Sequence, residues 1–285
     1  MKTTYVCTMA ALMTAVSAAT VKADFAFGKA TALKPTMNSS YFEYDPDISS
    51  DGLSLFFQCS RPDGYGDSDL YVCTRASTND EWGEPANLGP YINSPARELG
   101  PNISADGLSL YFSSTRDGGL GGNDIYVSMR DSLSAPWGTP VSLGPRVNSS
   151  FDDVSPCISA DGLSLYFSDW DGNGVPGRPG GYGQADIWVS RRVSLSAPWG
   201  PAVNLGATVN SATTEAAPDI SDDGLMLFFS GYRSGSPWDL WVCVRASIED
   251  DWSEPVNLGP AVNSSSVDLN QIGRASCRER VCHRV

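Results

Sequence analysis

The chain has 285 residues, which is enough for one large β domain or two small ones. It contains 28 Gly, 19 Pro and 8 Trp, a composition typical of short strands joined by frequent tight turns. The formal net charge of −14 opposes binding to nucleic acid and to anionic membrane surfaces. We therefore expect no nucleic-acid partner, and the acidic surface suits cationic ligands, metal ions or neutral glycans.

Residues 1–23 have the features of a signal peptide. Lys2 supplies the positive start, the segment from Val6 to Ala19 is mostly apolar and small, and small-residue cleavage sites end at Ala18 and Ala23. The apolar segment is short for a bilayer span, and no later segment could cross a membrane. A buried N-terminal helix is the alternative, but it fits poorly with a chain that is otherwise all β. The sequence predicts a periplasmic or extracellular protein with no transmembrane segment.

A repeat of about 55 residues runs through the rest of the chain. Asp-Gly pairs recur at steps of 55, 55 and 62 residues, beginning at Asp51, Asp106, Asp161 and Asp223. Tryptophans follow in the same phase at Trp82, Trp137, Trp199 and Trp252. Asn-Ser pairs do so as well, beginning at Asn38, Asn93, Asn148, Asn210 and Asn263. A period of this length is the signature of a repeat architecture.

Each repeat is predicted to contain four antiparallel strands. The first ends in Ile-Ser before the Asp-Gly turn, and the second alternates apolar residues, as in Leu108–Phe112. The third resembles Asp124–Val127, and the fourth follows the tryptophan, as in residues 84–94. The Gly-containing turns suit hairpins, because Gly takes positive φ without steric cost. Four strands per repeat predict an all-β propeller, whose blades bury both faces by stacking.

The segment Ile103–Arg130, ISADGLSLYFSSTRDGGLGGNDIYVSMR, with a Trp and an NLGP-type strand nearby, resembles the WD40-like β-propeller repeat of the TolB type. The resemblance covers about residues 27–270 and implies a propeller scaffold. It implies little about function, because this family is defined by its scaffold. TolB itself carries an N-terminal α/β domain for which this chain shows no counterpart, so we do not carry over the partners of TolB.

An acidic residue stands five positions after each Asn of the Asn-Ser pairs. These acids are Glu43, Glu98, Asp153, Glu215 and Asp268. Each precedes the innermost strand of its blade, so a propeller would place them around one mouth of the central channel. Converging carboxylates would suit a cation or a basic ligand. The alternative is that each acid accepts backbone or arginine hydrogen bonds within its own blade, as a structural repeat requires.

The loop SDWDGNGVPGRPGGYGQAD of blade three breaks the repeat, because the step of 62 adds seven residues to the usual 55. Asp169, Asp171 and Asn173 alternate like the first half of a calcium loop, so calcium is a candidate cofactor. The twelfth position holds Gly180 where such a loop has Glu, and a simple Asp/Gly-rich hairpin loop is the alternative.

The same loop contains two aromatic residues and differs from the other blades at a position that they fill with arginine. Trp170 and Tyr182 are candidate stacking platforms for a sugar, or covers for the blade edge. Counted from the Asp-Gly turn, Asp171 stands where the other blades carry an arginine. These arginines are Arg61, Arg116 and Arg233.

Two further residue sets are expected to be structural. The repeated tryptophans fit packing between blades better than ligand stacking. Cys59, Cys73, Cys157 and Cys243 do not follow the repeat, which favours buried thiols; a Cys59–Cys73 disulfide is the alternative.

Catalytic patterns are scarce. The only histidine is His283, so the sequence offers no Ser-His or Cys-His pair upstream of the tail and no histidine metal site. We interpret the protein as a non-catalytic propeller that binds a protein or glycan ligand in the cell envelope. One alternative is a glycoside hydrolase or lyase using carboxylates such as Asp169, Asp171 and Glu215. A purely structural envelope module is the third possibility.

The two ends of the repeat region predict further blade segments. Phe27 and Asn38 have the spacing of Trp82 and Asn93, which is that of a fourth strand. At the other end, residues 263–268 begin another repeat. We expect a propeller domain over residues 24–270 that has five blades when complete. Residues 271–285 lose the repeat and carry four Arg and two Cys, so we expect this basic tail to be foreign sequence.

Overall fold

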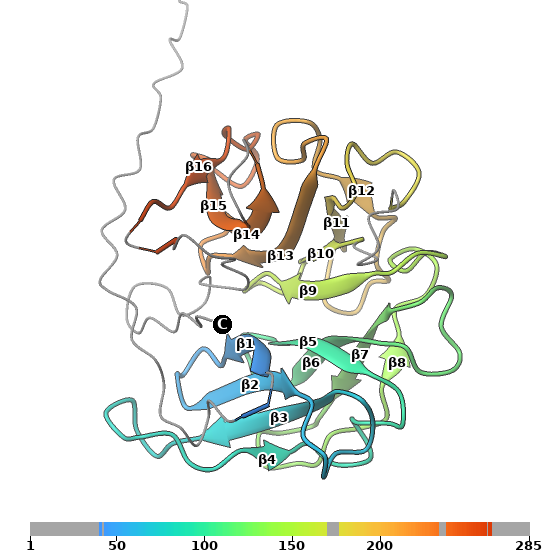
Figure 1. Ribbon diagram of the computed structural model, residues 1–285, viewed down its shortest axis with the longest axis vertical. Helices are drawn as coiled ribbons and strands as arrows, with labels where there is room; N and C mark the ends of the chain where they lie inside the picture. Colours follow the sequence, from blue (N-terminus) through green and yellow to red (C-terminus); the bar gives the residue numbers. More distant parts are fainter. Residues whose placement is uncertain (1–39, 42, 170–176, 234–237, 261, 264–285) are drawn as a thin grey trace, which may run out of the picture.

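The computed structural model describes residues 40–41, 43–169, 177–233, 238–260 and 262–263. These residues form sixteen strands in four antiparallel sheets of four strands each. Figure 1 shows the four sheets arranged as the blades of a propeller, with β1, β5, β9 and β13 nearest its centre. The all-β propeller and the four strands per repeat that the sequence predicted are therefore confirmed.

The strands of each blade follow one another in chain order from the inner to the outer edge. Blade one contains β1 (Glu43–Ile48), β2 (Ser54–Cys59), β3 (Asp69–Thr74) and β4 (Ala86–Asn87). Blade two contains β5 (Glu98–Ile103), β6 (Ser109–Ser114), β7 (Asp124–Met129) and β8 (Val141–Ser142). Blade three contains β9 (Val154–Ile158), β10 (Ser164–Ser168), β11 (Ile187–Arg191) and β12 (Val203–Asn204). Blade four contains β13 (Thr214–Ile220), β14 (Met226–Tyr232), β15 (Asp239–Val244) and β16 (Val256–Asn257).

The outermost strand of each blade is much shorter than the sequence suggested. In blade one we expected a strand over residues 84–94, but β4 has only two residues. The chain turns at Gly89, whose φ of 82° is readily available only to glycine, and the amide of Asn93 donates to the Gly89 carbonyl at 2.9 Å. The Asn93 side chain then binds the amide and carbonyl of Leu70 at 2.8 and 3.0 Å. The repeated asparagine thus anchors the connection to the next blade.

Each innermost strand carries a β-bulge at the same repeat position. Four residues there have φ between 51° and 55°, namely Asp45, Gly100, Ser155 and Ala217. The bulge shifts the strand register against the neighbouring strand and bends the chain near the propeller centre. A Cβ atom on Gly100 would lie 3.2 Å from the Cα of Ser155, so the inner strands of blades two and three approach closely at this point.

The hydrophobic core lies between the blades. Tyr111, Ile125 and Val147 of blade two pack with Phe167 and Trp199 of blade three, and the other adjacent blade pairs share clusters of the same kind. Two further clusters each draw on a single blade, blade one or blade four. Side chains from facing sheets therefore join consecutive blades, as stacked repeats require.

Polar side chains also link consecutive inner strands. The Oδ2 atom of Asp47 accepts a hydrogen bond from the amide of Ile103 at 2.6 Å. At the same repeat position in blade two, Asn102 Oδ1 accepts from the amide of Ile158 at 2.8 Å. Cys157 Sγ accepts from the amide of Ile220 at 3.4 Å. Each of these residues supplies an acceptor for the next blade.

The four cysteines outside the two terminal regions are free and buried, so the disulfide alternative for Cys59 and Cys73 is not adopted. Burial raises the pKa of both thiols to about 11.

Within the described segments, none of the chain forms a helix of the length and apolarity needed to span a bilayer.

Candidate functional site

The repeated acids are buried and paired with arginines of their own blades. Glu98, Asp153 and Glu215 have no exposed surface. Their nearest arginine nitrogens lie 3.0, 2.6 and 2.9 Å away, on Arg116, Arg178 and Arg233 respectively. In blade one the contact is longer, with 3.7 Å between Arg61 and Glu43. A ligand at these carboxylates would have to displace the arginines.

Serine donors complete the binding of these carboxylates. The Ser94 amide and hydroxyl donate to Glu98 at 2.9 and 2.6 Å, and the Ser211 amide and hydroxyl do the same to Glu215. Burial raises the pKa of Asp153 to about 6, although Arg178 opposes the shift. These are the within-blade contacts of the structural alternative. The Asp268 position lies outside the described residues.

Blade three also has an arginine at the position that Arg116 holds in blade two. Counting from the Asp-Gly turn puts Asp171 at this position, because the sequence alone does not show where the seven extra residues lie. The structure places the extra residues before Arg178, whose Nε and Nη2 atoms both donate to Asp153 Oδ1, at 2.9 and 2.6 Å. The guanidinium of Arg178 therefore takes the role of Arg116, and the assignment of Asp171 was wrong on this point.

Asp169 holds the base of the blade-three loop. It is 1% exposed, and its two carboxylate oxygens accept the amides of Asp186 and Arg178, each at 2.7 Å. Burial raises the pKa of Asp169. Asp171 and Asn173, the other predicted calcium ligands, lie outside the described residues, as does Trp170. Among the described residues, no group of three or more acidic, Cys or His side chains is placed to hold a metal ion.

Tyr182 lies on the surface of the same loop. Its side chain is 53% exposed, and its amide donates to the Oδ2 atom of Asp186 at 2.5 Å. An exposed ring can contact a ligand or can simply cover the blade edge, so both interpretations of Tyr182 stay open.

The repeated tryptophans are part of a structural unit in every blade. In blade three, Arg192 lies 4.4 Å above the Trp199 ring and donates from Nε to the carbonyl of Gly162, in the Asp-Gly turn. The equivalent arginine and tryptophan pairs lie 4.2 to 4.3 Å apart. The arginine thus joins the first turn of the blade to the loop before its outer strand, and stacking on the ring adds a cation–π contact.

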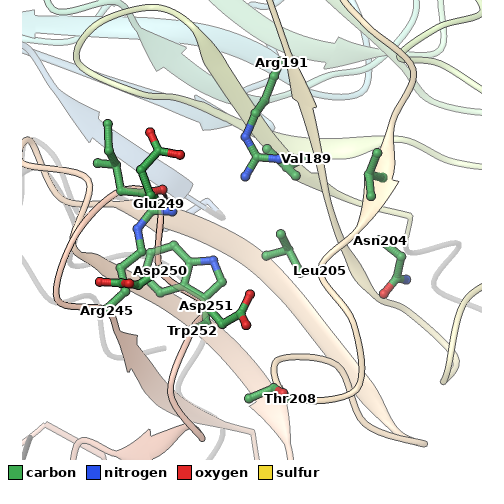
Figure 2. Close-up of a pocket in the computed structure, with 12 residues that line it drawn as sticks. Val189, Arg191, Asn204, Leu205, Thr208, Arg245, Glu249, Asp250, Asp251 and Trp252 are labelled. Atoms are coloured by element: carbon green, nitrogen blue, oxygen red, sulfur yellow. Dashed lines mark hydrogen bonds between the residues drawn. The ribbon is translucent and has the colours of Figure 1, made fainter. Parts of the chain in front are cut away.

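A groove lies between blades three and four, at the outer strand of one and the loop before the outer strand of the other. Figure 2 shows its lining residues on segments of the two blades, with Arg245 against the Trp252 ring. The blade-three side consists of Val189, Arg191, Val203, Asn204, Leu205 and Thr208. The blade-four side consists of Arg245, Ile248, Glu249, Asp250, Asp251 and Trp252. We call this the blade 3–4 groove.

The blade 3–4 groove carries charges that the equivalent positions of blades two and three lack. Arg191 stands where the other blades have Thr74, Met129 and Val244. Residues 249–251 are Glu-Asp-Asp. Blade one has Asn-Asp-Glu at the equivalent 79–81, whereas blades two and three have Ser-Ala-Pro at 134–136 and 196–198. Two blades form without the acidic residues, so the scaffold does not require them, and Arg191 is particular to blade three. Comparing the blades position by position would have found them, but sequence reasoning considered only the blade-three loop.

The chain is a β-propeller. No protein-family model matches it, and a search of curated proteins found no match. Among solved structures it is similar to a thermostable family-43 glycoside hydrolase, with 16% identity, a TM-score of 0.53, and coverage of 81% of this chain and 76% of the other.

Two TolB structures are also similar. The one from Agrobacterium tumefaciens is 22% identical, with a TM-score of 0.49 and coverage of 79% and 69% of the two chains. TolB from Acinetobacter baumannii is 17% identical, with a TM-score of 0.44 and 75% of this chain aligned. The propeller spans 45% of the length of that TolB. The likeness to the glycoside hydrolase shows the fold alone, and the propeller that the repeat predicted is confirmed by the four antiparallel blades.

The blade 3–4 groove combines the surfaces that a binding site needs. Val189, Leu205 and Trp252 supply apolar surface, and side chains of both charge signs surround it. Three carboxylates, on Glu249, Asp250 and Asp251, stand on the blade-four side and two arginines complete the charged lining.

Proposed function

We propose that this propeller is a non-catalytic binding module that holds a protein or glycan ligand in the blade 3–4 groove. The observation that carries the proposal is the departure of this groove from the repeat. A structural repeat explains residues that recur in every blade, whereas Arg191 recurs in no other described blade and acidic residues like those at 249–251 recur only at 79–81 of blade one. Exposed polar residues of this kind are better explained by binding than by packing.

The burial of two of the three candidate catalytic carboxylates argues against the enzymatic alternative; the third, Asp171, lies outside the described residues. A glycosidase needs an acid and a second carboxylate that both reach the sugar bond. Asp169 and Glu215 are 1% and 0% exposed, and backbone amides or serine groups already bind their oxygens. The similarity to a glycoside hydrolase concerns the fold, and one fold supports many functions. Export to the cell envelope stays a prediction from residues 1–23.

A turnover assay separates binder from enzyme. The purified protein is incubated with arabinan and xylan, and the release of reducing ends is measured against a Glu215→Gln variant. We expect both proteins to stay at the buffer background. Turnover by the wild type would overturn the proposal, and its loss in a Glu215→Gln protein that thermal unfolding shows to be folded would assign the activity to Glu215.

A binding assay tests the groove itself. The wild type and an Arg191→Met variant, which carries the residue found in blade two, are screened on a glycan array and against a displayed library of random 12-residue peptides. We expect at least one ligand whose binding weakens in Arg191→Met. If every ligand binds both proteins equally, the groove is not the binding site.

A further inference from the structure

Two exposed aliphatic side chains face solvent at the blade 3–4 groove, one from each blade. Val203 on β12 is 54% exposed, and Ile248 in the blade-four loop is 61% exposed. Both lie in the lining of a cavity of about 510 Å³. An exposed aliphatic side chain on each blade gives a ligand an apolar contact with each wall of the groove.

Some charged groups of the groove are already engaged in structural contacts. Arg245 donates to the carbonyls of Gly224 and Ile248 at 2.8 and 2.9 Å and stacks on Trp252 at 4.3 Å. Asp250 accepts the Ser247 hydroxyl at 2.9 Å. Arg191 makes a side-chain hydrogen bond with Tyr166, which leaves other N–H donors of its guanidinium for a ligand. The charged groups that can meet a ligand are therefore Glu249, Asp251 and Arg191. Together they carry a net charge of −1, because the arginine contributes +1 and the two carboxylates contribute −2.

The stacked arginine makes the groove a poor sugar platform. Sugars bind proteins through the open face of an aromatic ring, and the Trp252 face nearest Arg245 is covered by the guanidinium. The surface that remains is aliphatic, with carboxylates on the blade-four side. This combination matches a peptide that carries a basic and an aliphatic side chain. The net charge of −14 also favours the approach of a basic partner.

We propose that the blade 3–4 groove binds an extended basic segment of a protein partner. A Val, Leu or Ile side chain of the segment packs on Ile248, and a neighbouring Lys or Arg lies against Glu249 and Asp251. Arg191 donates hydrogen bonds to backbone carbonyls of the segment from the opposite wall. The inference rests on the proposed binding function and names its partner class.

A display selection with matched variants tests the inference. A library of random 12-residue peptides is selected on the wild-type protein and counter-selected on the double variant Glu249→Gln/Asp251→Asn. The control is Asp80→Asn/Glu81→Gln, which removes the same two charges from the equivalent loop of blade one. Binding of the enriched peptides is then measured by fluorescence anisotropy at low and high salt. All three proteins are first compared by thermal unfolding to verify that they are folded.

The expected result is enrichment of peptides with Lys or Arg next to an aliphatic residue. Their affinity should fall about tenfold in the groove variant, as loss of two partly exposed charge contacts implies, and stay within about twofold in the control. High salt should weaken binding to the wild type. Enriched peptides without basic residues, or equal losses in the groove variant and the control, would overturn the inference.

A glycan outcome separates this inference from the proposed function. If no peptide is enriched but a glycan binds the wild type and not the groove variant, the binding function stands and the basic-peptide partner is refuted. If neither peptide nor glycan binding depends on the groove residues, both proposals fail.

Discussion

Buried ion pairs within the blades stabilise the chain only while both partners are present. Asp153 has no exposed surface, and Arg178 supplies two of its hydrogen bonds. The guanidinium also lies 4.9 Å from the Phe167 ring centre. Removing one partner of such a pair leaves a buried charge without compensation, whereas removing both costs much less.

We therefore expect Arg178→Met to lower the free energy of unfolding by about 3–5 kcal/mol. The double variant Arg178→Met/Asp153→Asn should recover a large part of that loss, because the buried charge is gone. Urea unfolding of the wild type and both variants measures this. An equal loss in the single and double variants would show that the packing of Arg178, and not the ion pair, carries the effect.

Asp45 makes the stability of the propeller depend on pH. It is buried in the bulge of β1, and burial raises its pKa to about 7, against an opposing hydrogen bond with the Gly100 backbone. In the unfolded chain an aspartate titrates near pH ~3.9. The folded state therefore holds the proton more tightly, so this group's contribution to stability is present below about pH 4 and lost as the pH rises to 7.

Replacing Asp45 by Asn should remove this pH dependence. We expect Asp45→Asn to be more stable than the wild type at pH 8 by about 1–3 kcal/mol, with little difference at pH 4. Asn also tolerates the φ of 52° found at this position. The measurement is urea unfolding between pH 4 and 8, with Asp63→Asn, an exposed residue of the same blade, as the charge control. A gain of the same size in the control would point to net charge instead of the buried site.

At the scale of the element, the blade-three loop is an addition to a complete blade. Its base is fixed on both sides, because Asp169 accepts the amide of Arg178 and the Asp186 amide. A side chain at Gly177 would collide with the Asp169 carboxylate, so glycine is needed there. The residues after Arg178 then follow blade two position by position, with Asp186 matching Asp124.

Deleting residues 170–176 should leave the blade intact. The deletion restores the step of 55 residues, and we expect the unfolding free energy to change by less than about 1 kcal/mol, because loop length has a weak effect on stability. It also removes Asp171 and Asn173, so any calcium heat of the wild type should vanish in calorimetric titration. A variant with a Gly/Ser segment of equal length is the control. Calcium heat that persists in both variants would refute the predicted site, and a large loss of stability in the deletion alone would show that the loop is structural.

At the scale of the whole molecule, the blades are joined by packing and by single hydrogen bonds between inner strands. Asn102 is 2% exposed and provides the acceptor for the Ile158 amide of the next blade. Blade one uses Asp47 at the same position for Ile103. A buried amide that loses its acceptor costs about 1–3 kcal/mol.

We expect Asn102→Ala to lower the unfolding free energy by about 1–3 kcal/mol and to speed hydrogen exchange of the Ile158 amide. Asn102→Asp keeps an acceptor that blade one already uses, so its loss should be smaller. Denaturant unfolding and amide exchange measure the two effects. Faster exchange in both variants alike would mean that the contact does not depend on the acceptor.

Much of the fold could be predicted from the sequence, because blade structure depends on local patterns. The alternation in segments such as Leu108–Phe112 sets which side chains face a neighbouring sheet, and the Asp-Gly pairs set the hairpins between the first two strands. The length of the outer strand could not be read in this way. Its end depends on the turn at Gly89 and on the binding of Asn93 to Leu70, which lies 23 residues earlier.

The sequence by itself determined the repeat, the four strands of each blade and the absence of a histidine-based site upstream of the tail. Only the tertiary structure decided which groups meet. It placed Arg178 beside Asp153 across the added residues, closed the repeated carboxylates from solvent, and brought Arg191 of one blade near Glu249 of the next. The reason is physical: strand alternation and turn conformation act over a few residues, whereas burial and charge pairing depend on segments that folding brings together from far apart in the chain.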